Sequence, residues 1–216
     1  MATKSDFAAA NLYQDLMVEL KARAESINAV TGLSATIPAP LLREYGYLQL
    51  RMMCELIALG CLVAHGDIPA THTKSFQKAY DPADIFRKLE ALHPDFYPVP
   101  IKPEKTPDGW HFDQYDKPYL TKSELIRLYG KCGDVLHKGS VRKLLNGKVQ
   151  PVVNFDDINE WGQKLLNLVS SHRIGRIGNK LQFIVLFSLT GQAQVAIGEA
   201  IEPALSERGA VEPPDQ

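Results

Sequence analysis

Residues 41–65 constrain the fold of this chain more than any other part of its sequence. They read LLREYGYLQLRMMCELIALGCLVAH, about seven helical turns without a proline. A helix that is apolar on nearly every side either crosses a membrane or forms the centre of a globular core. The uncharged run 56–64 is shorter than the ~20 residues that a bilayer crossing needs. We therefore expect a core helix around which the remaining elements pack.

Three charged residues lie close together on this helix. At ~100° per residue, Glu44, Arg51 and Glu55 fall within a stripe roughly 40° wide. One interpretation of this buried charge stripe is a self-compensated structural ladder, because buried charges are tolerated only when they are paired. The alternative is that the stripe lines a polar pocket facing a second helix, which would suit a small-molecule sensor.

Apolar periodicity predicts a mainly α fold. Stripes of apolar residues and stop signals favour helices over about 5–31, 41–65, 82–92, 121–139 and 154–172, with a short helix around 74–79. Strand-like segments on either side of TPDG and TGQA predict two β-hairpins, at about 98–116 and 181–201. The expected fold is a bundle of five to six helices with these two β-hairpins at its periphery.

We expect one domain. Residues 1–203 form a single helical-bundle domain with an inserted aromatic hairpin at 93–119 and a C-terminal β-hairpin at 180–202, and 204–216 form a flexible tail. The aromatic residues of the inserted segment form either a flap that closes one end of the bundle or a stacking surface for a base or a partner. These aromatic residues are Phe96, Tyr97, Trp110, Phe112, Tyr115 and Tyr119.

Composition and motifs disfavour several classes of protein. A formal net charge of −1 argues against non-specific coating of nucleic acid, although it allows a local basic patch. The patterns HExxH, GxSxG, GxGxxG and the phosphate loop are absent, so we expect no cofactor and no resident metal. Cys54, Cys61 and Cys132 form no CxxC pair, which predicts free thiols in a reducing compartment. With no apolar signal core in MATKSDF, we expect a cytoplasmic protein and no membrane partner.

The helix expected at 121–139 carries the stretch LYGKCGDVLHKG, residues 128–139. A glycine inside a helix costs ~1 kcal/mol relative to alanine. Gly130 and Gly133 therefore suggest that another backbone approaches this helix closely. If that backbone belongs to another chain, the protein is a non-catalytic interaction module, either a homodimer or a partner-binding domain.

The same stretch resembles HEPN-type domains, the nucleotide-binding helical bundles of prokaryotes and eukaryotes. Many members carry an arginine followed four to six residues later by a histidine, and dimerise so that two such motifs form a metal-independent ribonuclease site. Here Lys131 and His137 have five residues between them, with lysine in place of arginine. The resemblance implies a homodimer that binds or cleaves RNA, in a prokaryotic defence or toxin setting.

A catalytic site of this kind would direct a ribose 2′-hydroxyl onto the adjacent phosphate. His137 would act as general acid or base, because an unperturbed pKa of ~6.5 lets a histidine work both ways near neutrality. Asp134 would orient His137, and Lys131 or Arg127 would stabilise the charge of the phosphorane. The alternative is a structural histidine that the helix dipole favours at the helix end and that bonds to Asp134.

Basic residues follow this helix and recur near residue 175. Residues 138–150 contain no acidic residue, and SSHRIGRIGNK adds further cations after the next helix. They form either ordinary solvated surface or a phosphate-binding patch beside His137, which would make RNA binding dependent on salt. The candidate phosphate-binding residues are Lys138, Arg142, Lys143, Lys148, Arg173, Arg176 and Lys180.

Overall fold

The computed structural model describes residues 2–31, 37–107, 109–137, 154–176, 181–187 and 192–199, and this part of the chain is mostly helical. The helical elements are α1 Lys4–Thr31, α2 Ala39–Ala64, the 3-10 turn η1 Pro69–His72, α3 Lys74–Gln77, α4 Pro82–Glu90, α5 Lys122–Leu136 and α7 Asp156–Val169. The strands are β1 Val99–Thr106, β2 Gly109–Gln114, β3 Ser171–Gly175, β4 Leu181–Phe187 and β5 Ala193–Glu199.

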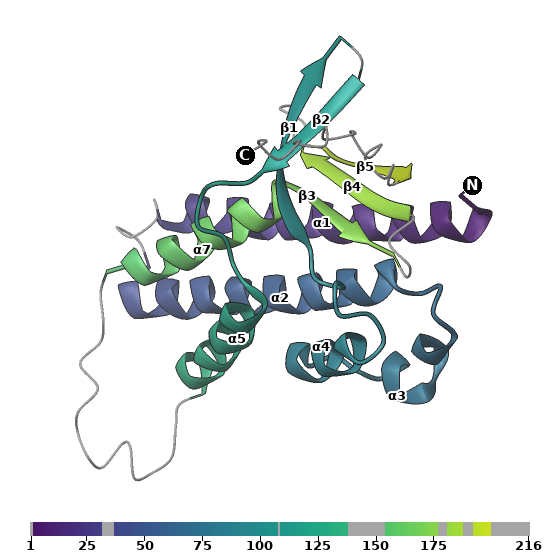
Figure 1. The fold of residues 1–216 in the computed structure, drawn as a ribbon. Helices are drawn as coiled ribbons and strands as arrows, with labels where there is room; N and C mark the ends of the chain where they lie inside the picture. The colour runs from purple at the N-terminus through teal and green to yellow at the C-terminus, as the bar shows by residue number, and fades with distance from the viewer. Residues whose placement is uncertain are drawn as a thin grey trace, which may run out of the picture.

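Helix α2 is the central element, as its sequence predicts. It contacts α1, α4, α5, α7 and β3, and Leu50, Met53 and Cys54 on it are fully buried. Helices α1 and α2 run side by side in Figure 1. They are antiparallel, because Tyr13 packs against Gly60 while Arg23 donates to Gln49 at 2.9 Å. Proline in the first turn of α2 suits the fixed φ of that position.

By length and composition α2 is also apolar enough to cross a membrane. In the described part of the chain it is the one helix with this property, and 61% of its most apolar window is buried inside the fold. Central helices of soluble domains share that composition.

The five strands form one antiparallel sheet in the order β2-β1-β3-β4-β5. The two predicted hairpins exist as β1–β2 and β4–β5, but the prediction of two separate peripheral hairpins is wrong. Strand β3 joins them, because Val99 of β1 pairs with Arg173 and Ser171 of β3 pairs with Leu186. The helix predicted to reach His172 ends at Val169, and the chain enters β3 directly.

One face of the sheet packs against the helices and the other is more open. Ile174, Phe183 and Val185 are fully buried, and the Phe183 ring lies 6.0 Å from that of Tyr13 on α1. On the opposite face, a Cβ on Gly198 would lie 3.2 Å from Ile184 Cδ1. The small residue at this position therefore lets a side chain of the neighbouring strand cross it closely.

The aromatic segment is divided between the core and the surface. Phe96 is fully buried, and its ring lies 5.3 Å from that of Phe86 on α4. In contrast, the β1–β2 hairpin projects beyond the rest of the fold (Figure 1), and Trp110 on it is 56% exposed. The beginning of the segment is therefore an anchor, and the hairpin itself is an exposed arm.

Candidate functional site

Helix α5 holds the four candidate catalytic residues. A capping box between Thr121 and Glu124 fixes its start, as predicted, and it ends at Leu136 with His137 as the C-cap residue. Lys131 and His137 lie six residues apart, so they point about 120° away from each other around the helix. They therefore do not share a face.

Lys131 contacts a carboxylate on another helix. Its Nζ lies 3.4 Å from Oδ2 of Asp157 on α7 and 5.7 Å from the centre of the Tyr47 ring on α2. Asp157 also accepts hydrogen bonds from both terminal nitrogens of Arg43, at 2.7 Å each, and from the Tyr47 hydroxyl at 2.6 Å. Hydrogen bonds from Arg43 hold the pKa of Asp157 far below its ordinary value. These four residues join α2, α5 and α7.

The other three catalytic candidates do not converge. Arg127 Nη2 lies 3.5 Å from Glu124 Oε1, and its guanidinium lies 5.3 Å from the Trp161 ring. Asp134 and His137 are both exposed, and the side chain of neither makes a hydrogen bond or ion pair in the described ranges. The expected hydrogen bond between them is therefore not seen.

Tyr129 of α5 bonds to both Arg51 and Glu55 of the charge stripe on α2. Arg51 Nη2 donates to the Tyr129 hydroxyl at 2.7 Å, and this hydroxyl donates to Glu55 Oε1 at 3.1 Å. Arg51 Nε also lies 3.3 Å from Glu55, and its guanidinium lies 4.3 Å from the centre of the Tyr129 ring. Burial, with the Glu55 charge, raises the pKa of Tyr129 to about 12. This geometry agrees with a self-compensated ladder between α2 and α5. Glu44, partly buried, lies two turns earlier on α2.

The two glycines of α5 have different surroundings. A Cβ on Gly133 would lie 3.6 Å from Arg51 Nη1, so the missing side chain makes room for a guanidinium. A Cβ on Gly130 would meet nothing within 4 Å. A close backbone approach is therefore not found at either glycine within the described chain.

The candidate phosphate-binding residues fall into three groups. Arg173 lies on β3 and is exposed. Arg176 is only 2% exposed and forms ion pairs with Asp6 and, at 3.1 Å, with Asp67. Arg176 is thus a buried structural cation and not part of a surface patch. The remaining candidates lie outside the described residues, and they are Lys138, Arg142, Lys143, Lys148 and Lys180.

Arg173 lines an open cleft of about 610 Å³ between the sheet, residues 94–99 and the start of α5. The Tyr97 hydroxyl donates to the Leu120 carbonyl at 2.9 Å, which fixes the two segments of this wall together. Lys122 is paired with Glu90. The lining residues are Pro94, Asp95, Tyr97, Pro98, Val99, Tyr119, Thr121, Lys122, Arg173, Gly175 and Gln182.

The sequence indicated residues of this cleft as candidate binding residues, but it did not indicate that they lie close together. Tyr97 and Tyr119 belong to the predicted stacking surface, and Arg173 to the predicted phosphate patch. They come together because β3 pairs with β1 at the point where the aromatic segment enters the sheet. No local pattern in residues 171–175 distinguishes that strand from a loop.

No protein-family model, curated protein or solved structure matches this chain. The fold and the site define a mostly helical domain with a five-stranded antiparallel sheet and a cleft at the sheet's outer side. The resemblance of residues 128–139 to HEPN domains stays a prediction.

Proposed function

We propose that this protein binds single-stranded RNA in the cleft lined by Tyr97, Tyr119 and Arg173. The observation that carries this proposal is the state of Arg173. It is exposed, and within the described part of the chain its guanidinium takes part in no ion pair or hydrogen bond. An unpaired guanidinium offers a planar fork that fits a phosphate through two hydrogen bonds.

The tyrosines supply the second half of the recognition. Unpaired bases bind proteins by stacking on aromatic rings, and this contact tolerates any base sequence. Tyr97 and Tyr119 are both half-buried, so each ring is held in place while part of it faces the cleft. A cleft of about 610 Å³ falls in the size range of small-ligand pockets, roughly 300–1,000 Å³, and suits a short unpaired segment rather than a duplex.

The charge of the cleft predicts a modest dependence on salt. Arg173 is its one cation without a partner in the described ranges, because Lys122 pairs with Glu90, and Asp95 adds a negative charge. Each phosphate contact with a single strand changes the slope of log K against log salt by about −0.7. A slope near −0.7 supports phosphate contacts made by the cleft only. A much steeper slope requires additional phosphate contacts from the basic run 138–148.

Binding is better supported than cleavage. Lys131 contacts Asp157 and Tyr47, and Arg127 contacts Glu124 and the Trp161 ring. Phosphoryl transfer needs its acid, base and charge-stabilising groups within reach of the same phosphate. That arrangement is missing among the described residues of one chain, so we assign no catalytic step.

The test is a fluorescence-anisotropy titration of labelled oligouridylate with the full chain in EDTA. Arg173→Gln should weaken binding about ten- to a hundredfold, the effect of losing one charge-assisted contact. Arg127→Gln is the matched control, because Arg127 is also exposed but lies on α5 outside the cleft. Unchanged binding by Arg173→Gln, or an equal loss in both variants, would contradict the proposal. Gels of the same samples, with His137→Ala beside the wild type, report any cleavage.

A second candidate function, a homodimeric interaction module, is favoured by the exposed ridge of α2. Leu41 is 53% exposed and Leu48 is 42% exposed. Tyr45, which lies between them, and Met52, which follows Leu48 by one turn, are half-buried. Their spacing of four, three and four residues places them on one face of the helix. An apolar helix face of this kind is typical of a surface that meets another protein.

The oligomeric state tests this second candidate. Under the homodimer hypothesis, light scattering after size exclusion finds a dimer for the wild type and a monomer for Leu48→Glu. Trp110→Glu is the control, because Trp110 is similarly exposed but lies on the projecting hairpin (Figure 1). A monomeric wild type, or equal dissociation of both variants, would exclude the α2 ridge as the dimer contact.

A further inference from the structure

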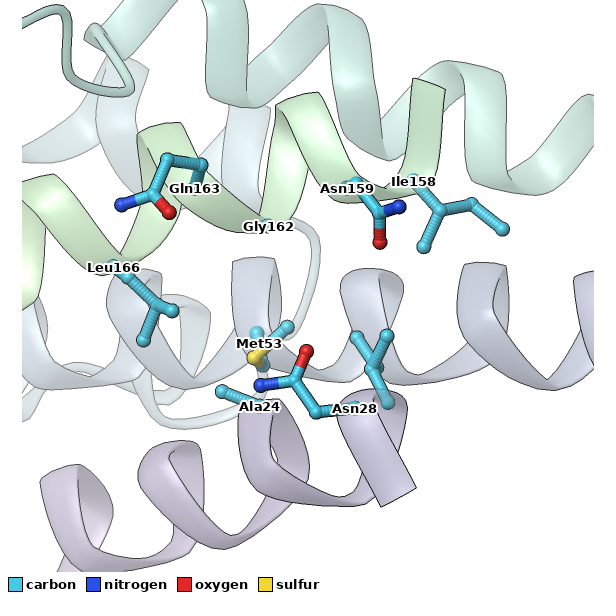
Figure 2. A pocket seen from close by; sticks show the side chains of 9 residues that line it. Ala24, Asn28, Met53, Ile158, Asn159, Gly162, Gln163 and Leu166 are labelled. Atoms are coloured by element: carbon cyan, nitrogen blue, oxygen red, sulfur yellow. The ribbon is translucent and has the colours of Figure 1, made fainter. Parts of the chain in front are cut away.

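We propose a second binding site, a pocket between α1, α2 and α7 that takes a small neutral ligand with a flat apolar body and an amide-like polar group. The pocket has a volume of about 250 Å³ and is separate from the RNA cleft. Figure 2 shows α1 and α7 on opposite sides of it. Its lining residues are Ala24, Ile27, Asn28, Met53, Ile158, Asn159, Gly162, Gln163 and Leu166.

A glycine in α7 contributes to the open space. Gly162 lies one turn from Ile158 on one side and one turn from Leu166 on the other, on the same face of the helix. A Cβ on Gly162 would meet nothing within 4 Å. A side chain at this position would therefore start in open space, and a large one would occupy the pocket.

The floor and the rim have different chemistry. Ala24, Ile27, Met53 and Ile158 are buried, so the floor is apolar. Three carboxamides stand at the rim, and Figure 2 shows those of Asn28 and Asn159 reaching toward the space from opposite helices. Gln163 Nε2 donates to Asn167 at 2.9 Å, which leaves the Gln163 carbonyl oxygen able to accept a hydrogen bond from a ligand.

The lining sets the charge and the size of the ligand. None of the nine lining residues is charged, so a charged ligand would lose its hydration without gaining a counter-charge. At about 30 Å³ per water, the pocket equals roughly eight waters in volume, which suits a single aromatic ring with one small substituent. The Met53 thioether favours an aromatic ring, since sulfur–aromatic contacts are attractive. The carboxamides of Asn159 and Gln163 at the rim can pair with an amide on that ring.

Benzamide and benzoate are matched probes, because they have nearly the same shape and differ in charge. The readout is the Met53 methyl signal in a carbon–proton NMR spectrum of the full chain. Benzamide should shift this signal with a dissociation constant on the order of millimolar, as expected for so small a ligand. Benzoate should bind at least about tenfold more weakly. An unmoved Met53 signal at about 10 mM benzamide, or equal binding of benzoate, would overturn the proposal.

Two leucine substitutions locate the binding. Gly162→Leu should abolish the benzamide shift by filling the pocket. Gly130→Leu is the control, since Gly130 is also an α-helical glycine with open space around its Cβ position, on α5 away from the pocket. Asn159→Ala, which keeps the space but removes a rim carboxamide, should weaken benzamide several-fold. Retained benzamide binding by Gly162→Leu would place the ligand elsewhere and reject this pocket.

Discussion

His172 should make the folded state lose stability as the pH falls from about 6.5 toward 4. It is fully buried in β3, with Nδ1 3.0 Å from the Val169 carbonyl and Nε2 2.7 Å from the Tyr13 hydroxyl. A carbonyl can only accept, so Nδ1 carries the proton and Nε2 accepts from Tyr13. The neutral ring therefore satisfies both contacts. Burial lowers the pKa of His172 from 6.5 to about 4.

The size of the effect follows from that pKa difference. The difference between 6.5 and about 4 corresponds to about 3 kcal/mol, at 1.36 kcal/mol per pKa unit. Between these values the unfolded chain binds the proton more readily than the folded chain, so the free energy of unfolding falls as the pH drops. The contribution is complete above pH 6.5 and is lost by about pH 4. Burial also lowers the pKa of His65, which adds in the same direction.

Urea unfolding at a series of pH values between 7 and 4 measures this loss. His172→Gln should be less stable than the wild type at pH 7 but should lose about 3 kcal/mol less on acidification. Carboxylates are the same in both proteins, so the difference between their pH profiles isolates the histidine. Parallel profiles for the wild type and His172→Gln would refute the reasoning.

Three further predictions concern charges. In urea unfolding, Asp157→Asn should lower the free energy of unfolding by about 2 kcal/mol, because Arg43 loses its carboxylate partner. The exposed Asp134→Asn should change it by less than ~0.5 kcal/mol, and equal effects of the two substitutions would contradict a stabilising Arg43–Asp157 pair. Arg176→Met should cost about 3–5 kcal/mol in the same assay by leaving two carboxylates without a counter-charge, and a loss below ~1 kcal/mol would argue against these pairs. Asp95→Asn should strengthen oligouridylate binding about two- to fivefold in anisotropy by removing a negative charge from the cleft, and weaker binding would be the contrary result.

The sequence predicts most of the helices because their signals are local. The apolar character of 41–65 indicates burial on most sides, and α2 is the centre of the fold. The Thr121–Glu124 pair marks the start of α5 for a similar reason, since all its hydrogen bonds lie within one turn.

Strand β3 could not be predicted in this way. Its partners are β1 and β4, and no residue in 171–175 shows that β1 lies alongside. Only the alternation of buried His172 and Ile174 with exposed Arg173 reveals the strand, and five residues are too few to separate that pattern from a loop. The joining of the hairpins into one sheet, and with it the cleft, depends on this strand.

The partners of the charged residues could not be predicted from the local sequence either. Arg176 and Asp6 are 170 residues apart, so their pairing leaves no mark on the local sequence, and Arg176 resembles a surface cation. The sequence identified the Arg51–Glu55 stripe, but it gave no sign that Tyr129 of another helix completes it. Lys131 matched a catalytic spacing, although its nearest carboxylate lies on α7. Distant partners decided the role of each charge.

Photo-crosslinking tests the RNA proposal most directly. The full chain is irradiated with an oligouridylate that carries 4-thiouridine, and the crosslinked peptides are mapped. We predict crosslinks at Tyr97 or Tyr119, which decrease in Arg173→Gln in proportion to its weaker binding and are kept in Arg127→Gln. Crosslinks confined to peptides outside the cleft, such as the β1–β2 hairpin or the basic run 138–148, would contradict it.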